Sequence, residues 1–335
     1  MKFFGVLCVI VGVIMLLAPL AAVSVKSPVR ENGTETESVA EETVLTSAVS
    51  SDTPGDTISV FMTDKNETEV LDMRQYIIGT VAAEMPASYE KEALKAQALA
   101  AVTFAVYRKQ QGGDPDMDGA DISDNSSSHQ GYMSREQMEE KWGEAFDTYY
   151  AKIENAVNEV LDKIITCDGK PIMAAYHAIS CGKTESAKVL WGADVPYLRS
   201  VSSEWDKESA RYKTEVRFSV SELEKLLSSE KSEFTDEDRA KGVKIKDVSD
   251  SGTVLRCEIF SVDMTGAKAR NLLSLRSPVF DAVYSDGEYV FTVYGYGHGI
   301  GMSQNGANCM AKEGRTYEEI IAHYYSGTEI SERQK

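Results

Sequence analysis

The sequence predicts an α+β fold in which a helical front part packs against an antiparallel β-rich rear part. Apolar residues recur at helical spacing between residues 76 and 108 and again between 134 and 163. Alternating apolar and polar residues dominate 253–295, and the strands and helices do not alternate as they do in a doubly wound sheet. An apolar N-terminal segment adds a transmembrane helix to this prediction.

The N-terminus carries Lys2 and then runs from Phe3 to Val25, 23 residues, without a charge. A segment of that length can span a bilayer. We therefore interpret residues 1–26 as an uncleaved single-pass anchor, which leaves the chain after Lys26 on the extracytoplasmic side of the cell membrane. A cleaved signal peptide is the alternative, since small residues lie between Ala18 and Ala22, but its apolar region would be unusually long.

The charge balance restricts the partners. The chain has 35 Lys and Arg against 53 Asp and Glu, which gives 35 − 53 = −18. This charge repels phosphate backbones and anionic lipids, so nucleic acid is not an expected partner. Residues 27–57 are rich in Glu, Thr and Ser and predict a flexible acidic linker, and a folded domain is expected at 58–330, beginning with a strand at Ile58.

The first helix of this domain carries a carboxylate on its apolar face. Glu84 follows Ile77 by seven residues and therefore lies on the face formed by Ile77, Val81 and Met85. Pro86 disfavours a helical Met85, which places Glu84 in the last turn, at the negative end of the helix dipole. Apolar surroundings and a helix C-terminus both raise a carboxyl pKa, so Glu84 is the candidate general acid. The alternative is a surface glutamate at a frayed helix end.

A second helix is expected to begin with Ser88 as its N-cap and to pack closely through a small-residue face. That face consists of Leu94, Ala98, Ala101 and Ala105.

Residues 109–133 are polar and rich in Gly and Asp, which predicts a long loop. The Asp spacing in this loop lacks the Gly and Glu that a calcium loop requires. A third helix is expected over 134–163 with Ser134 as its cap, followed by a short strand.

Polar and aromatic side chains converge after that strand, at Tyr176, His177, Ser180 and Cys181. The alternative for His177 is a buried histidine whose bonds go to the backbone. His177 and Cys181 have a metal-like spacing, but no third ligand is evident. Cys167 and Cys181 allow one disulfide bond without requiring it.

The rear part is predicted to contain a helix and charged loop at 221–246 and several strands at 253–295, with a turn at Asp286–Gly287. Glycines then stand at every second position between Gly295 and Gly301, which permits unusual backbone conformations and close approach of another segment. His298 and Gln304, in and after this run, have side chains suited to sugar hydroxyls and amides.

These segments resemble the stage II sporulation protein D and amidase-enhancer family of bacterial cell-wall proteins. The matching motifs occur in family order and are AAEMPASYEKEALKAQALAAVTFA, AYHAISCGKTES, VPYLRSV, GYGHGIGMSQNGA and IIAHYYSGT. The resemblance spans about Asp72 to Thr328.

The resemblance implies a membrane-anchored lytic transglycosylase that cuts peptidoglycan glycan strands, preferably peptide-free ones, during engulfment in sporulation. Glu84 would be its catalytic acid and base, and the expected partners are a cell-wall amidase and other membrane engulfment proteins. The implied substrate-binding residues are Tyr197, Arg199, His177, Ser180, His298 and Gln304.

The chain departs from the family pattern in two respects. Val102 stands where the family commonly has arginine, so a basic group expected near Glu84 is missing. Ser123 and His129 stand where zinc-binding members have cysteines, so no metal and no other cofactor is expected. The alternatives to the transglycosylase are a non-enzymatic wall-binding amidase enhancer of the same fold and a hydrolase with a separate base.

Overall fold

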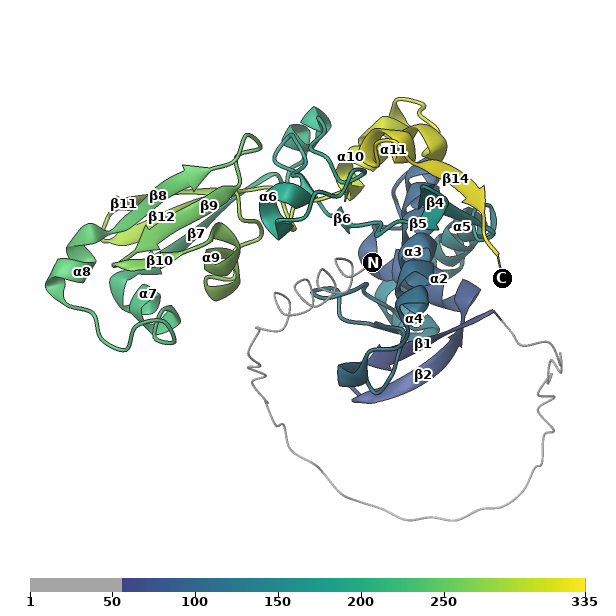
Figure 1. The fold of residues 1–335 in the computed structure, drawn as a ribbon, viewed down its shortest axis with the longest axis horizontal. Helices are drawn as coiled ribbons and strands as arrows, with labels where there is room; N and C mark the ends of the chain where they lie inside the picture. Colours follow the sequence, from purple (N-terminus) through teal and green to yellow (C-terminus); the bar gives the residue numbers. More distant parts are fainter. Residues whose placement is uncertain (1–55, 335) are drawn as a thin grey trace, which may run out of the picture. The chain divides into compact units, whose positions relative to one another are not determined.

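The computed structural model describes residues 56–334 (Figure 1). The expected anchor at 1–26 and nearly all of the expected linker at 27–57 lie outside the described residues. Within residues 56–334 there is no helix of the length and apolarity needed to cross a membrane.

Two consecutive helices form the centre of the larger hydrophobic core. Helix α2 (Met73–Glu84) begins where the Asp72 side chain accepts a hydrogen bond from the Gln75 N–H, and it ends where Met85 turns extended before Pro86. The predicted end of this helix is therefore confirmed. The longer α3 (Lys91–Gln111) follows after a short turn.

The predicted cap at Ser88 is wrong, because Glu90 occupies the N-cap position of α3 and makes no side-chain cap bond. The chain first closes a turn in which the Tyr89 N–H donates to the Pro86 carbonyl at 2.9 Å. The Glu90 N–H then donates to Asn308 Oδ1 at 2.8 Å, so a distant residue satisfies the start of the helix.

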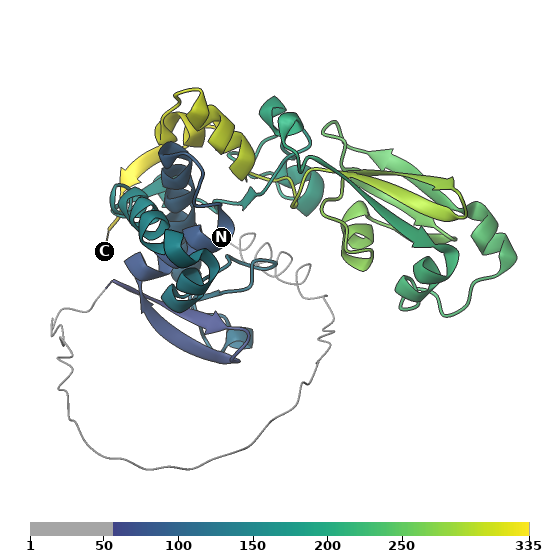
Figure 2. The same ribbon diagram turned by 180° about the vertical axis from the view of Figure 1, so that it is seen from behind.

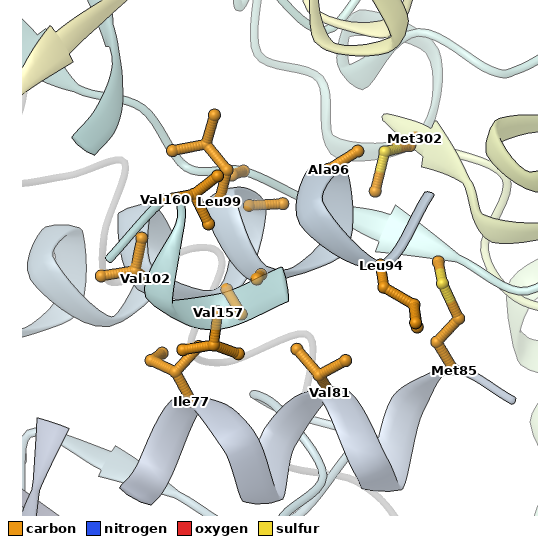
Figure 3. Close-up of a cluster of buried hydrophobic side chains, with 14 of the residues drawn as sticks. Ile77, Val81, Met85, Leu94, Ala96, Leu99, Val102, Val157, Val160 and Met302 are labelled. Carbon is orange, nitrogen blue, oxygen red and sulfur yellow. The ribbon is translucent and has the colours of Figure 1, made fainter. Parts of the chain in front are cut away.

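Small and apolar side chains let α2 and α3 approach closely, as predicted. In Figure 3, Ile77, Val81 and Met85 point from α2 toward α3. The small-residue face of α3 is fully buried. Such burial of tightly packed apolar surface stabilises the core by roughly 25 cal/mol per Å².

The third predicted helix is divided at Gly143. Helix α4 (Arg135–Trp142) begins with a capping box formed by Ser134 and Gln137, which confirms the predicted cap. Gly143 has φ +50, a conformation that glycine adopts at little cost, and it starts a single 3-10 turn. Helix α5 (Phe146–Asn158) then packs on α2 and α3.

The loop after α3 is tied to the first strand. It contains a 3-10 turn (Pro115–Met117) and a short strand, β3 (Ile122–Ser123), which pairs in parallel with β1 (Thr57–Met62). On its other edge β1 pairs antiparallel with β2 (Glu67–Asp72). Within the loop, Asp121 accepts bonds from Ser59.

The C-terminal segments complete the larger core on the other side of α3. Helices α10 and α11 contact α3, and β4 is the middle strand of a sheet with β5 and β14. A two-stranded parallel pair joins β6 to β13. The bounds of these elements are β4 (Lys163–Cys167), β5 (Lys170–Pro171), β6 (Tyr176–His177), α6 (Ala187–Trp191), a 3-10 turn (Glu204–Glu208), β13 (Met302–Ser303), α10 (Gln304–Lys312), α11 (Tyr317–Tyr324) and β14 (Glu329–Glu332).

The β-rich segment between residues 213 and 294 has a hydrophobic core of its own. Its two antiparallel sheets have the strand orders β10-β9-β8 and β11-β12-β7, and Figures 1 and 2 show them from opposite sides. Its elements are β7 (Lys213–Ser219), α7 (Val220–Leu226), α8 (Asp236–Lys241), β8 (Val243–Val248), β9 (Val254–Ile259), β10 (Val262–Met264), α9 (Gly266–Leu272), β11 (Phe280–Ser285) and β12 (Glu288–Tyr294).

The α+β class and the antiparallel strands are confirmed, and the turn at Asp286–Gly287 joins β11 to β12 as predicted. Two expectations are corrected. The segment expected as a charged loop before residue 246 contains α8 and part of β8. The front helices bury their apolar faces against α5, α10 and α11 rather than against the sheets of the β-rich segment, whose core contains no residue of α2 or α3.

Candidate active site

Glu84 is the last residue of α2 and is partly exposed, while the neighbouring Met85 is buried. Its Oε1 accepts a 2.5 Å hydrogen bond from the backbone N–H of Gly131. The carboxyl group therefore faces the loop after α3, and the residue as a whole is partly exposed.

Burial raises the pKa of Glu84 above its ordinary value of 4.5. The N–H of Gly131 and the side chain of Gln304 oppose this rise, because both donate to the ionised form. The direction of the shift agrees with the prediction, and its cause is the predicted burial of the carboxyl group. Such a group holds a proton longer than a free glutamate and still has donors ready for the anion that it leaves.

Gly131 has little space for a side chain. A Cβ there would lie 3.1 Å from Glu84 Oε1 and 3.3 Å from the Cβ of Ala83. The adjoining residues lie directly on α2, since the Met133 N–H donates to the Gly79 carbonyl at 3.2 Å. A Cβ on Gly79 would lie 2.4 Å from the Tyr132 ring. Two glycines thus bring the loop and the helix together at the carboxylate.

Amide side chains extend the polar surroundings of Glu84. Gln304, the first residue of α10, interacts with Glu84 and donates from Nε2 to Gln97 Oε1 at 3.3 Å. Gln97 is fully buried on α3. Because an amide can donate two hydrogen bonds from one nitrogen, Gln304 links the carboxylate to the core helix.

Tyr176 on β6 continues this network. Its hydroxyl donates to Gln130 Oε1 at 3.1 Å, and Gln130 Nε2 donates to the Ala101 carbonyl at 3.3 Å. Burial and the nearby Glu84 charge raise the pKa of Tyr176 well above 10. Tyr176 is therefore a hydrogen-bond donor at every physiological pH, and it fixes the residue that precedes Gly131.

His177 and His298 lie together with their ring centroids 5.8 Å apart. Nδ1 of His177 is 3.1 Å from the Ile300 carbonyl and must donate, whereas Nδ1 of His298 accepts from the Ile300 N–H at 3.0 Å. Burial lowers the pKa of His177 to about 4 and that of His298 to about 3. Both rings are neutral at pH 7 and have fixed tautomers.

The glycine run adopts the conformations that its spacing predicts. Gly295, Gly297, Gly299 and Gly301 all have positive φ, between +73 and +113. A Cβ on Gly301 would lie 1.9 Å from the Ala175 carbonyl oxygen. The run thus lets β13 approach β6 and holds Gln304 at the start of α10.

The other predicted substrate-binding residues have partners away from Glu84. Tyr197 accepts from the Met173 N–H at 3.1 Å, and the exposed Arg199 pairs with Asp194 at 3.4 Å. Ser180 is buried, and its N–H donates to the carboxylate of Asp206. The described contacts of these three residues do not reach Glu84.

Asp206 is a buried carboxylate that joins three segments. It accepts hydrogen bonds from the Ser180 N–H, the Ser203 hydroxyl and the Asn305 side chain, each at 2.9 Å. This residue was not among the predicted ones.

Val102 lies on α3 within the larger hydrophobic core. Figure 3 shows Val102 beside Val160, at the side of the apolar cluster away from Met85. Its side chain is fully buried. The position that departs from the family pattern therefore belongs to the packed face of α3, and the effect of the missing basic group on Glu84 stays a prediction.

The cysteines within residues 56–334 are free thiols, so Cys167 and Cys181 do not form a disulfide. The thiol of Cys181 donates to the Ser251 carbonyl at 2.8 Å. Ser123 Oγ accepts from the Asn125 N–H, and burial lowers the pKa of His129 to about 4. Residues 56–334 hold no group of three or more potential metal-ligating side chains.

Sequence reasoning missed the closest partners of Glu84. Gly131 contributes a backbone N–H, which every residue except proline has, so its type carries no signal for this role. Gln97 could have been noticed as an amide within an otherwise small and apolar face of α3. Tyr176 is part of the predicted polar and aromatic cluster, but its hydrogen bond to Gln130 was not predicted.

Comparisons with known proteins agree with one another. A family model described as SpoIID, stage II sporulation protein, matches residues 62–167. The chain is 35% identical to stage II sporulation protein D of Bacillus subtilis, over 99% of this chain and 96% of that protein. It is 34% identical to the protein of the same name from Bacillus amyloliquefaciens, over 97% of this chain and 94% of that protein. It is also 25% identical to the amidase enhancer of Bacillus subtilis, over 76% of this chain and 40% of that protein.

Proposed function

The chain belongs to the stage II sporulation protein D family, and from this premise we propose that it is a lytic transglycosylase that cleaves peptidoglycan glycan strands with Glu84 as acid and base. The observation that carries the proposal is a carboxyl group with a raised pKa that is partly exposed and has two hydrogen-bond donors.

In the first step Glu84 acts as the acid. The protonated carboxyl donates to the glycosidic oxygen, the bond from that oxygen to C1 of the muramic acid breaks, and positive charge develops on the sugar ring. Glu84 becomes an anion at this moment. The Gly131 N–H and the Gln304 amide stabilise the new anion, since both donate to Glu84.

In the second step the same residue acts as the base. The carboxylate takes the proton from the 6-hydroxyl of the sugar while O6 bonds to C1, which closes an anhydro ring and restores the protonated Glu84. No water is consumed and no second carboxylate is required. The donors to Glu84 are a backbone N–H and an amide side chain, and neither of them is an acid.

The direct test incubates the full-length chain with peptide-free glycan strands and analyses the products by mass spectrometry. We expect anhydromuramic ends, and we expect Glu84→Gln to form none while it binds the strands as the parent does. Reducing ends would indicate hydrolysis with a separate base. The absence of both products from the parent would refute an enzyme.

The second candidate function is a non-enzymatic, wall-binding enhancer of an amidase. The similarity to the amidase enhancer of Bacillus subtilis favours it. On this view Glu84→Gln would leave the biological effect of the chain intact, and a purified amidase would cleave wall material faster in the presence of either protein.

The location proposed for this activity is the outer side of the cell membrane, with residues 1–26 as a single-pass anchor. The uncharged stretch from Phe3 to Val25 supports this, and glycan substrates lie on that side. The proposed partners are glycan strands, a cell-wall amidase and other membrane proteins of engulfment. Extraction of cell membranes at high pH tests the anchor, because a spanning protein stays in the membrane fraction.

A further inference from the structure

Two arginines near the glycine run have no carboxylate partner within residues 56–334. Arg270 lies in the last turn of α9, and Arg276 follows it by six residues. Most other described arginines pair with an acid, for example Arg74 with Glu154 and Arg315 with Glu319. Since the chain has 53 acidic residues against 35 basic ones, a shortage of acids does not explain the difference.

Arg270 is held by the backbone and is only partly exposed. Its Nε donates to the Leu275 carbonyl at 3.4 Å, and the Leu275 N–H donates to the Arg270 carbonyl at 2.9 Å. Burial lowers the pKa of Arg270, and its charge in turn lowers the pKa of His177 and His298. A cation that has lost part of its hydration, beside two neutral rings, gains strongly from an anionic ligand.

Arg276 lies over the exposed ring of Tyr296, which also interacts electrostatically with Arg270. Its guanidinium is 5.4 Å from the centre of the Tyr296 ring, which is 43% exposed. The backbone is fixed as well, because the Gly297 N–H donates to the Arg276 carbonyl at 2.9 Å. A guanidinium stacked on a ring keeps its N–H donors free at its edges.

The neighbourhood of these arginines also contains sugar-compatible surfaces. The ring centroid of His298 is 5.8 Å from that of His177 and 6.3 Å from that of Trp191. The Tyr296 N–H and carbonyl are both bonded to Ile179, so the aromatic ring projects from a fixed backbone. The same glycine run leads directly into Gln304 at Glu84.

We propose that Arg270 and Arg276 form a subsite for a carboxylate on the glycan strand, namely the lactyl carboxylate of N-acetylmuramic acid that is exposed once the stem peptide has been removed. The two guanidinium groups bind its oxygens, and Tyr296 holds Arg276 in position.

The chemistry of the strand identifies the anion. The lactyl group is the acidic substituent of a peptide-free strand, and in an intact strand the same group is an uncharged amide. A pair of arginines therefore favours the peptide-free strand through a charge-assisted hydrogen bond that the amide cannot provide. This inference rests on the proposed action on glycan strands and assigns residues to the preference for peptide-free ones.

The test measures binding rather than cleavage. The full-length chain with Glu84→Gln is titrated by calorimetry with a peptide-free tetrasaccharide and with the same tetrasaccharide whose lactyl groups are methyl amides. We expect the acid to bind about tenfold more tightly or better, since charge-assisted hydrogen bonds are worth more than that factor. Arg270→Gln and Arg276→Gln should each reduce the preference, and the double variant should lose it while affinity for the amide stays within about twofold.

Arg256→Gln is the matched control, because this exposed arginine on β9 has only a distant partner at 3.9 Å. It should keep the full preference, and Arg270→Lys should keep part of it.

The subsite is refuted if the parent binds both ligands equally or if the double variant retains the preference. Unchanged binding of the amide ligand shows that a variant is folded. If the double variant does not fold, the single variant Arg276→Gln, which changes an exposed residue, serves as the test. A parent that prefers the acid but forms no anhydro ends would refute the enzyme and leave the subsite standing.

Discussion

At the scale of single residues, Glu84 experiences two opposing influences. Burial favours the neutral form, while the Gly131 N–H and the Gln304 side chain favour the anion. The first keeps the proton available, and the second lowers the energy of the group after the proton has left. A carboxyl with burial alone would hold its proton too firmly, and one with donors alone would already be ionised.

The pH dependence of stability should reveal the raised pKa. Above the ordinary value of 4.5 the unfolded chain loses the Glu84 proton while the folded chain still holds it, so the free energy of unfolding falls as pH rises toward the folded pKa. The variant Glu84→Gln does not show this fall in the free energy of unfolding, because glutamine does not ionise. Urea unfolding at several pH values should show that the free energy of unfolding of the variant rises relative to that of the parent as pH increases from 4.5 toward the folded pKa. The comparison isolates Glu84, because the two proteins share all other titratable groups. A difference that is constant with pH would contradict the raised pKa.

Gly131→Ala should slow the proposed reaction without unfolding the protein. The added Cβ would lie 3.1 Å from Glu84 Oε1 and would push the carboxylate away from the N–H that binds it. We expect the rate of anhydro-end formation to fall by about a hundredfold, as when one donor to a developing charge is lost. Ser127→Ala, an exposed change in the same loop, should keep the parent rate. If Gly131→Ala is fully active, the N–H has no catalytic part.

At the scale of elements, the contact between α2 and the loop at 131–133 decides where Glu84 points. Gly79 makes this contact possible, because the Tyr132 ring lies where a side chain would be. Tyr132 in turn stacks on Tyr76 with ring centroids 5.8 Å apart. The helix thus carries its own docking surface for the loop two turns before the carboxylate.

Gly79→Ala tests this contact, and the sign of its effect is informative. Glycine to alanine in a helix normally stabilises by about 0.5–1 kcal/mol. Here the new Cβ would lie 2.4 Å from the Tyr132 ring and 2.6 Å from the Met133 carbonyl oxygen, so we expect a loss of roughly 1–3 kcal/mol. Urea unfolding measures this change. A gain in stability would show that the loop does not depend on the contact.

Local signals explain what could be predicted at this scale. The end of α2 follows from Pro86, the cap of α4 from Ser134, and the β11–β12 turn from Asp286–Gly287. The start of α3 could not be predicted, since its first N–H is satisfied by Asn308 from another part of the chain. The two-residue strands β6 and β13 are too short to show a period, so their pairing could not be predicted either.

The candidate site divides in the same way. Glu84 could be found because a carboxylate on an apolar helix face is unusual. Its partner Gly131 acts through the backbone, which leaves no trace in residue type. Tyr197 and Arg199 were predicted through the family resemblance, and their contact with substrate stays a prediction.

At the scale of the whole molecule, buried polar residues join segments that are far apart in the chain. Asp206 binds Ser180, Ser203 and Asn305 through its carboxylate and is fully buried. It thereby connects the segment after β6 to α10. Buried donors that lose their acceptor are costly, so such a residue controls the stability of all three segments.

Asp206→Ala should therefore destabilise the fold strongly. Three donors would lose their acceptor, at about 1–3 kcal/mol each, and we expect a loss of roughly 3 kcal/mol or more. Thermal and urea unfolding measure the loss. Asp194→Ala, which removes an exposed acid with a single partner at 3.4 Å, should change stability by less than about 0.5 kcal/mol. Similar small losses of stability for both variants would show that Asp206 does not stabilise the three segments to which it is bonded.

The buried histidines should make the protein sensitive to acid. The pKa is lowered from 6.5 to about 4 for His129 and His177 and to about 3 for His298. Unfolded chains take up these protons below pH 6.5 while the folded chain does not, so stability is full above pH 6.5 and declines as pH falls toward 4. Ring proton resonances of the three histidines should not titrate between pH 8 and 5. A midpoint near 6.5 for any of them would contradict its burial as a neutral ring.

The long separation between partners in the chain has a consequence for the order of assembly. Gln97 and Gln304 are 207 residues apart, and the bonds from the Glu90 N–H to Asn308 Oδ1 and from the Tyr317 N–H to Glu92 Oε2 span 218 and 225 residues. A chain made from its N-terminus has α2 and α3 long before it has α10 and α11. Glu84 therefore acquires its complete surroundings only when the last fifth of the chain has been synthesised and has packed on the earlier helices. An incomplete copy of the protein carries Glu84 without its Gln304 donor, so the order of synthesis delays the proposed activity until α10 and α11 have packed on α3.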